Sequence, residues 1–164
     1  MNLDSPLPDP HPIDLTPVPR TDVATITDAE PLASHRIEFR VQYKETDGQR
    51  RVHHANYPVY FESGRVEMLR TAGVVYRTLE DAGIYLVVTE MLTRYYDAAQ
   101  FDDWLTLTTE LIEIRKVRLR HRYWIDRGNV VIAQGESTIA CITHDGRPAR
   151  LPGEIIETFR RSGL

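Results

Sequence analysis

The sequence has very little cysteine and no long apolar segment. Cys141 is the only cysteine among the 164 residues, which excludes an internal disulfide framework and a cysteine-based zinc site. No apolar run approaches the ~18 residues that a membrane-spanning helix needs. The first residues also lack the basic and apolar regions of a secretory signal. We therefore expect a cytoplasmic protein without a membrane span.

An excess of positive charge is also lacking, because the formal net charge is −4. General nucleic-acid binders are normally basic, so we expect no nucleic-acid partner, although a local basic patch for a small phosphorylated ligand stays open. The length fits the prior of about 100–200 residues for one domain. Apolar residues at 41% and charged residues at 27% are ordinary globular usage and exclude a wholly disordered chain.

Proline is concentrated at the start of the chain, where residues 1–34 hold seven of the ten prolines. Proline fixes φ and donates no N–H, so we expect this stretch to be extended or unordered. It is either a loose, mobile tail or an arm that packs across a partner subunit through Val23, Ala24 and Ile26. The predicted organisation is therefore a proline-rich arm over residues 1–34 and one compact domain over residues 35–164.

Hydrophobic periodicity in the compact domain predicts one strand, one long helix and four further strands. Apolar residues alternate from Ile37 to Tyr43, which is typical of a strand with one buried face. Further strands are predicted over residues 84–96, 104–114, 119–125 and 130–143, with short helices near 74–82 and 154–161. A helix laid on one face of an antiparallel sheet is an α+β architecture.

The long helix is predicted from apolar residues at spacings of three and four between Tyr57 and Ala72. Asn56 suits its N-cap and Gly73 its C-terminal cap. Gly64 lies on the apolar face, where a glycine costs about 1 kcal/mol relative to alanine. We therefore expect the helix to approach the sheet closely at Gly64.

The loop before this helix has the residues for attack on a carbonyl group. Asp47 follows the first strand, and seven residues later the chain starts the helix near His54. Free N–H groups at a helix start attract a developing oxyanion, and a nearby carboxylate acts as a base or nucleophile. Spacing alone does not establish this role, because aspartate before a helix is more often a turn or cap residue.

Short motifs in this stretch carry a resemblance to a known family. They read Tyr43-x-x-Thr46-Asp47, then His54-Ala55-Asn56-Tyr57 and Tyr60-Phe61-Glu62. The pattern resembles that of the hotdog-fold acyl-CoA thioesterases of the 4-hydroxybenzoyl-CoA thioesterase family, particularly the variant associated with the Tol-Pal system. Residues 94–105 resemble the third-strand region of that family, and the resemblance covers about residues 36–143.

The resemblance implies a hotdog fold, an antiparallel sheet of about five strands wrapped around one long helix. It also implies a homodimer or homotetramer with the site at the subunit interface, which hydrolyses an acyl-CoA to free acid and CoA without a cofactor or metal. Asp47 would be the general base or the nucleophile. The His54 N–H would polarise the thioester carbonyl, and Tyr43 would form a hydrogen bond beside Asp47.

Candidate substrate-binding residues surround this motif or follow the third strand of the sheet. The resemblance assigns Tyr57 to the substrate, and it assigns Lys116 and Arg118 to CoA phosphates, with a solvated hairpin turn as the alternative. Arg50 and Arg51 replace a glycine and an apolar residue of the family pattern, so we expect the loop path to differ. Their guanidinium groups either meet an anionic substrate group or are solvated.

Four further interpretations belong to this point of the argument. Glu62 is a reserve catalytic carboxylate, because a helix carboxylate serves in a related branch of the fold. The adjacent His53 and His54 are expected to point apart, which argues against a metal site. The arginines at 50 and 51 leave open a non-catalytic protein that binds an acyl group or CoA. A hydratase is a further alternative on the same fold.

Overall fold

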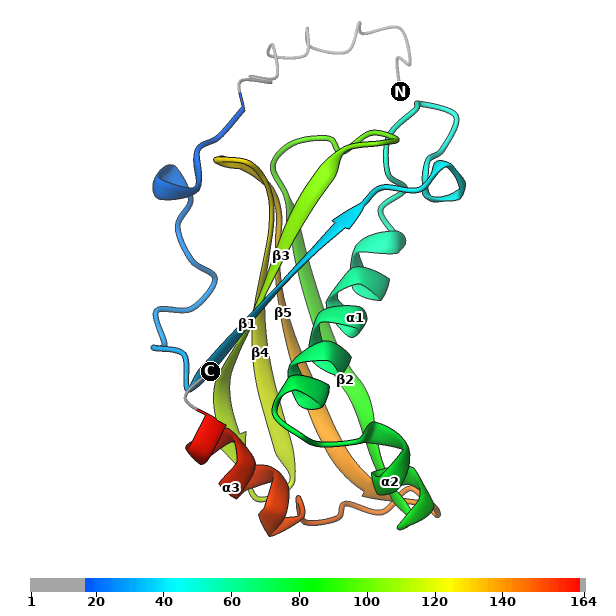
Figure 1. The fold of residues 1–164 in the computed structure, drawn as a ribbon, viewed down its shortest axis with the longest axis vertical. Coiled ribbons are helices and arrows are strands. Elements are labelled where there is room, and N and C mark those ends of the chain that lie inside the picture. The colour runs from blue at the N-terminus through cyan, green and yellow to red at the C-terminus, as the bar shows by residue number, and fades with distance from the viewer. Residues whose placement is uncertain (1–16, 163–164) are drawn as a thin grey trace, which may run out of the picture.

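The computed structural model describes residues 17–162, and these residues form one antiparallel sheet with a long helix across it (Figure 1). The sheet has the strand order β1-β3-β4-β5-β2. Its strands are β1 (Ala33–Arg40), β2 (Ile84–Tyr95), β3 (Trp104–Arg115), β4 (Arg118–Arg127) and β5 (Val130–Thr143). The predicted α+β architecture and the predicted order of elements are confirmed.

The helices are α1 (Asn56–Thr71), α2 (Tyr76–Asp81) and α3 (Gly153–Ser162), with short 3-10 turns η1 (Arg20–Asp22) and η2 (Tyr43–Glu45). Gly73 has a φ of +87° just beyond the end of α1, as a glycine in the predicted capping position does. Within residues 17–162, no helix combines the length and the apolar character that crossing a membrane requires.

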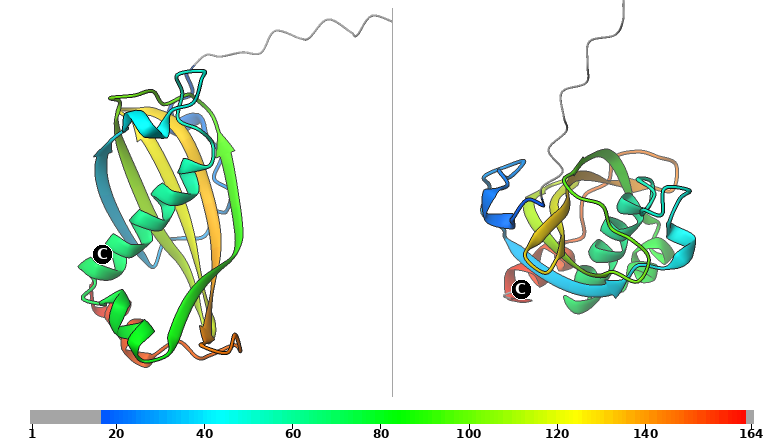
Figure 2. Two further views of the ribbon diagram at one scale, coloured as in Figure 1. Left: turned by 90° about the vertical axis from the view of Figure 1, so that its right-hand side faces the viewer. Right: turned by 90° about the horizontal axis from the view of Figure 1, so that it is seen from above.

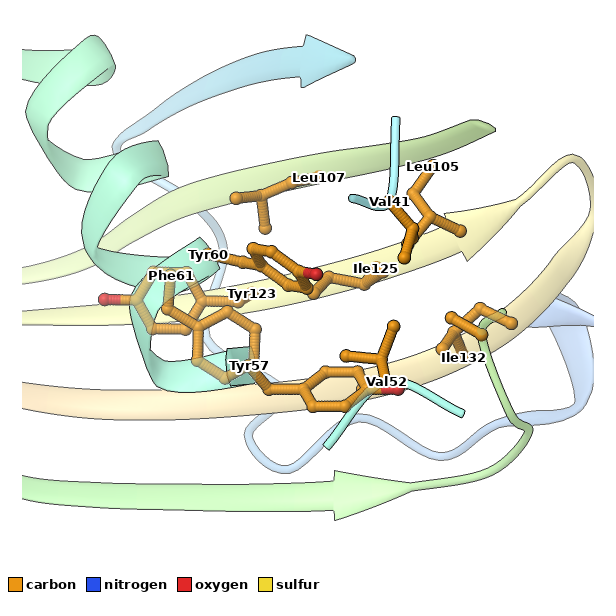
Figure 3. Packing of buried hydrophobic residues seen from close by; sticks show 12 residues of the cluster. Val41, Val52, Tyr57, Tyr60, Phe61, Leu105, Leu107, Tyr123, Ile125 and Ile132 are labelled. Carbon is orange, nitrogen blue, oxygen red and sulfur yellow. The ribbon is translucent and has the colours of Figure 1, made fainter. Parts of the chain in front are cut away.

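The sheet curls around α1, so that one face of this helix meets the concave face of the sheet (Figure 2). The buried aromatic rings of α1 pack against β3 and β4 (Figure 3). Phe61 stacks on Tyr123 with 4.5 Å between ring centroids, and Tyr60 packs on Phe39 at 4.6 Å. Because these contacts hold the first half of α1 on the sheet, the start of the helix has a fixed place beside the loops at that end.

The glycine on the buried face of α1 allows the close approach that the sequence predicts. Gly64 is buried, and a Cβ atom placed on it would lie 2.7 Å from Leu107 Cδ2 of β3 and would collide with Thr109 Oγ1. Gly135 of β5 likewise lets α1 approach the sheet, because a Cβ atom placed on it would lie 2.6 Å from Phe61 Cζ of the helix.

Strand β1 ends three residues earlier than predicted. The alternation from Ile37 to Tyr43 predicts a strand that includes Tyr43, but β1 stops at Arg40 and Tyr43 begins η2. The Gln42 N–H donates to Glu45 Oε2 at 2.7 Å, and Glu45 N–H donates to the Gln42 carbonyl. This reciprocal capping turns the chain out of the sheet, which the period-two pattern does not reveal.

Residues 17–32 lie on the convex face of the sheet, opposite α1 (Figure 2). Arg20 pairs with Asp126 at 2.7 Å and lies over the Trp124 ring, and Arg122 donates to the Thr27 carbonyl. The described part of the proline-rich arm therefore packs on its own subunit. Residues 1–16 lie outside the described residues, and a contact of the arm with a partner stays a prediction. The sheet begins at Ala33, inside the predicted arm.

We expect Gly64→Ala to lower the free energy of unfolding by at least about 1 kcal/mol, because the new methyl group overpacks the interface between α1 and β3. Chemical denaturation measures the change. Gly48→Ala is the matched control: a Cβ on Gly48 meets no atom within 4 Å, so its effect should stay within about 0.5 kcal/mol. Equal stability of the Gly64→Ala and wild-type proteins would contradict the close approach.

Candidate active site

The Asp47 loop is a tight turn that leads back toward α1. The Arg50 N–H donates to the Asp47 carbonyl at 2.9 Å, and the Asp47 N–H donates to the Arg51 carbonyl at 2.9 Å. A β-bridge between Thr46 and Val52 closes the turn at its base. This pattern is a turn followed by one left-handed residue, a standard solution for a short hairpin connection.

Arg50 is the left-handed residue of this turn, with a φ of +61°. Glycine adopts this conformation readily and a residue with a Cβ atom adopts it at a cost. The loop was expected to take a different path where Arg50 stands in place of a glycine. Arg50 takes a left-handed conformation that suits glycine, whereas Gly48 has no positive φ, and a loop path that differs from the family's stays a prediction.

The Asp47 carboxylate is held in place from inside the turn. Its Oδ1 accepts a hydrogen bond from the Gln49 N–H at 2.7 Å, as in an Asx turn. The side chain is half-buried and lines an open cavity of about 470 Å³. Among residues 17–162, no hydrogen bond to Oδ2 is found, so one carboxylate oxygen is available to a ligand in this cavity.

The start of α1 borders the same cavity. His54 lines it, and the His54 carbonyl accepts hydrogen bonds from the Tyr95 hydroxyl at 3.2 Å and from the Tyr57 N–H. No hydrogen bond of the described part of the chain uses the His54 N–H. An unpaired N–H at a helix start carries the positive end of the helix dipole. The structure therefore brings Asp47 and His54, both predicted from the sequence, to one cavity.

The two adjacent histidines do not point apart, contrary to the prediction. Their rings pack together with 4.1 Å between centroids, and His53 Nδ1 accepts a hydrogen bond from the Ala55 N–H at 3.2 Å. This bond curls the side chain of His53 back over the start of the helix. Within the described ranges, no group of three His, Cys, Asp or Glu side chains is placed to hold a metal ion.

Glu45 accepts four hydrogen bonds, two of which come from residues of α1. Its carbonyl accepts hydrogen bonds from the His53 N–H at 2.9 Å and from Asn56 Nδ2 at 2.7 Å. Its carboxylate accepts from the Tyr60 hydroxyl at 2.9 Å and from the Gln42 N–H. Asn56, predicted as the N-cap, is instead the first helical residue, and its side chain reaches back to Glu45.

Two tyrosines form one wall of the cavity. Tyr57 is buried and meets the half-exposed Tyr95 edge-on, with 5.0 Å between ring centroids. Burial raises the pKa of Tyr57 to about 12, so its hydroxyl stays protonated near neutral pH. The prediction placed Tyr57 at the substrate, and the structure places it in the cavity.

An ion-pair cluster that the sequence does not predict holds the far wall of the cavity. Arg127 of β4 donates to Asp97 Oδ2 at 2.8 Å, to Asp103 Oδ2 at 2.7 Å and to the Ala98 carbonyl at 2.9 Å. Asp97 lines the cavity. Arg127 lies 24 positions after Asp103 and 30 positions after Asp97, so no local pattern could have paired it with them.

Tyr43 does not join Asp47, contrary to the prediction. Its side chain is 77% exposed, does not line the cavity, and packs edge-on against Phe101 with 5.6 Å between ring centroids. The cause is the early end of β1: in η2 the tyrosine side chain turns outward instead of following the pleat of the strand.

Of the two predicted pairs of basic residues, one lies at the Asp47 cavity and the other lies far from it. Arg51 lines the cavity, and Arg50 is exposed on the same turn. Lys116 and Arg118 follow the last residue of β3. The loop that carries Asp47 is at the opposite end of this strand, where the Val41 N–H donates to the carbonyl of Asp103, the residue just before β3. A strand of twelve residues spans about 40 Å, so neither residue reaches the Asp47 cavity of its own chain.

Glu62 lies outside this cavity. It is exposed on α1 and lines a separate cavity between α1, α2 and the sheet. Within one chain the structure therefore does not bring this reserve carboxylate to Asp47.

Comparisons with known proteins agree with this geometry. Residues 41–159 match the family model described as the thioesterase-like superfamily. The acyl-CoA thioester hydrolase YbgC of Escherichia coli O157:H7 is 31% identical over 128 residues, which cover 77% of this chain and 96% of YbgC. The crystal structure of a probable thioesterase from Bartonella henselae is similar with a TM-score of 0.69 and 33% identity, covering 73% of this chain and 100% of that one.

A further solved structure supports the fold alone. It is a 4-hydroxybenzoyl CoA thioesterase variant complexed with 4-hydroxybenzoyl CoA, with a TM-score of 0.69 and 20% identity. The match covers 76% of this chain and 97% of that chain.

We expect Arg50→Gly to raise the free energy of unfolding by about 0.5 kcal/mol, because the relief of the left-handed strain exceeds the entropy that glycine adds to the unfolded chain. Denaturant titration of both proteins measures the difference. Arg51→Gly is the matched control, since Arg51 has no positive φ and should lose stability on the same change. A loss of stability in Arg50→Gly would contradict the strained turn.

Proposed function

The chain belongs to the thioesterase-like superfamily, has the hotdog fold and is an acyl-CoA thioester hydrolase, and we propose that Asp47 and the His54 N–H carry out the hydrolysis. The observation that supports this assignment is that a carboxylate oxygen and a backbone N–H just before α1, both without described partners, border one cavity. A thioester carbonyl bound between them would meet the attacking group on its carbon and a hydrogen-bond donor on its oxygen.

Asp47 acts on the thioester carbon as general base or as nucleophile. As a base, it takes a proton from water while the hydroxide forms the new C–O bond, and the C–S bond then breaks to release CoA thiolate, which takes up a proton. As a nucleophile, Oδ2 attacks the thioester carbon and the C–S bond breaks, which forms an acyl–aspartyl anhydride and releases CoA thiolate, which takes up a proton. Water then opens the anhydride to the free acid and the Asp47 carboxylate. Single turnover in ¹⁸O-labelled water separates the two, because only the anhydride route can leave the label on Asp47.

His54 provides the oxyanion site. Its N–H lies two residues before the first residue of α1, near the positive end of the helix dipole, which favours the negative charge that develops on the carbonyl oxygen. The His54 carbonyl is fixed by the Tyr95 hydroxyl, so the peptide groups at the helix start have little freedom to turn away. A donor of this kind typically contributes about 2.7–4 kcal/mol to transition-state stabilisation.

Arg50 and Arg51 are placed for the anionic part of the substrate. Both are exposed on the Asp47 turn, and Arg51 borders the cavity, where a guanidinium pairs well with phosphate or carboxylate. Lys116 and Arg118 lie too far away in the same chain. They contact CoA only if a second subunit brings them to this site.

We propose that the protein works as a homo-oligomer in the cytoplasm, without a cofactor. Strand β2 is an edge of the sheet, and it exposes Val88, Leu92 and Tyr95 to about half of their full extent. An apolar edge of this kind is normally covered by another chain. Coenzyme A esters are intracellular metabolites, and proton transfer with an oxyanion site is sufficient for the hydrolysis.

We expect Asp47→Asn to lower kcat by at least about 100-fold, the typical contribution of general acid–base catalysis. Asparagine keeps an oxygen for the Gln49 N–H, so the turn should be preserved. Thiol release across a set of acyl-CoAs measures the activity, and Asp145→Asn in a distant exposed turn is the control. Full activity of Asp47→Asn on every thioester would contradict the assignment. Thermal stabilisation of the wild type by acyl-CoA without thiol release would favour the non-catalytic alternative.

We expect Leu92→Glu to shift the protein toward the monomer, because it places a charge on the exposed edge strand. Sedimentation velocity at matched concentrations measures the shift. Val117→Glu, at an exposed position in the β3–β4 turn, is the control and should leave the assembly unchanged. A wild-type monomer, or an oligomer that Leu92→Glu leaves intact, would contradict assembly through β2.

A further inference from the structure

A second cavity lies between α1, α2 and the sheet, apart from the Asp47 site. It has a volume of about 500 Å³, within the range of small-molecule sites. Figure 1 shows α2 and the first half of β2 beside the second half of α1, the elements that enclose it. Most of its wall is apolar and comes from Leu69, Leu86, Val87, Leu119 and Ile139.

Arg65 brings a buried positive charge to this apolar cavity. The residue is only 8% exposed and lines the cavity from α1. Its Nη1 donates to the Tyr123 hydroxyl at 3.0 Å, and that hydroxyl is also bonded to Ser137. No carboxylate of the described residues forms an ion pair with Arg65. A buried cation without a counter-charge is costly, and a guanidinium offers five N–H donors in a planar fork.

His121 adds a second polar group without a partner. It lines the same cavity from β4 and is 3% exposed, and its Nδ1 has no hydrogen-bond partner in the described structure. Its ring stacks beside Tyr123, the residue on which Arg65 also rests. Burial and the nearby Arg65 lower the pKa of His121 to about 3, so the ring is neutral at physiological pH.

We propose that this cavity is a binding site for a small apolar carboxylic acid, whose carboxylate pairs with the Arg65 guanidinium and whose hydrocarbon part fills the apolar wall. A carboxylate matches the guanidinium with two parallel hydrogen bonds and supplies the missing counter-charge. The other charged residues that line the cavity, Glu62 and Glu80, are exposed, so solvent weakens their repulsion of the acid without abolishing it. Binding of a free acid does not depend on the proposed hydrolysis.

Titration calorimetry with octanoate and with 1-octanol, on the full-length protein, tests the site. Octanoate should bind the wild type at least about tenfold more tightly than octanol, because hydrogen bonds to charged groups contribute about 1.5–3 kcal/mol. Arg65→Met keeps much of the apolar volume and should remove this preference. Unchanged octanoate affinity in Arg65→Met, or equal wild-type affinity for the two compounds, would overturn the proposal.

Two further variants keep the test decisive if Arg65→Met folds poorly. Glu80→Gln removes a negative charge at the exposed side of the cavity and should tighten octanoate binding, whereas weaker binding would contradict a carboxylate ligand. Asp47→Asn should bind octanoate as the wild type does, since Asp47 lines the other cavity. Loss of octanoate binding in Asp47→Asn would instead assign the acid to the site of hydrolysis and overturn the second site.

Discussion

The Asp47 site depends on how Glu45 joins a loop to a helix. The backbone carbonyl of Glu45 holds His53 and Asn56, and its side chain holds Tyr60, so one residue ties the turn to the first two turns of α1. Burial and the hydrogen bond to Glu45 raise the pKa of Tyr60, which keeps this hydroxyl a donor. These bonds join the turn that carries Asp47 directly to the start of α1.

The helix itself is fixed from below by the sheet. Phe61 lies on Tyr123 and over Gly135, and Gly64 lets α1 approach β3 closely. Close packing of this kind allows the start of the helix only one position relative to the ends of the strands. The same helix then carries Arg65, eight residues after Tyr57 and roughly 12 Å further along its axis, into the second cavity. One rigid element therefore positions polar groups in two separate cavities.

Periodicity and glycine positions made much of the fold predictable. The apolar stripe of α1 and the alternation in the strands are local patterns. A glycine inside a helix lowers helix stability, so Gly64 indicated a close approach of the helix to the sheet. The position of Asp47 before the long helix was compatible with a carbonyl-attacking site, but the roles of Asp47 and His54 were predictable only from the family resemblance of the motifs that contain them. Tyr43 was misplaced because the capping between Gln42 and Glu45 overrides the alternation that continues through it. Arg127 and Tyr95 reach the site only through the sheet, so their sequence neighbours carry no signal.

The most direct test of the account is a crystal structure of Asp47→Asn with an acyl-CoA bound. We expect the thioester carbonyl oxygen to lie within about 2.7–3.1 Å of the His54 nitrogen, and the carbonyl carbon to face residue 47. A thioester bound away from both groups, with the His54 N–H still unoccupied, would contradict it.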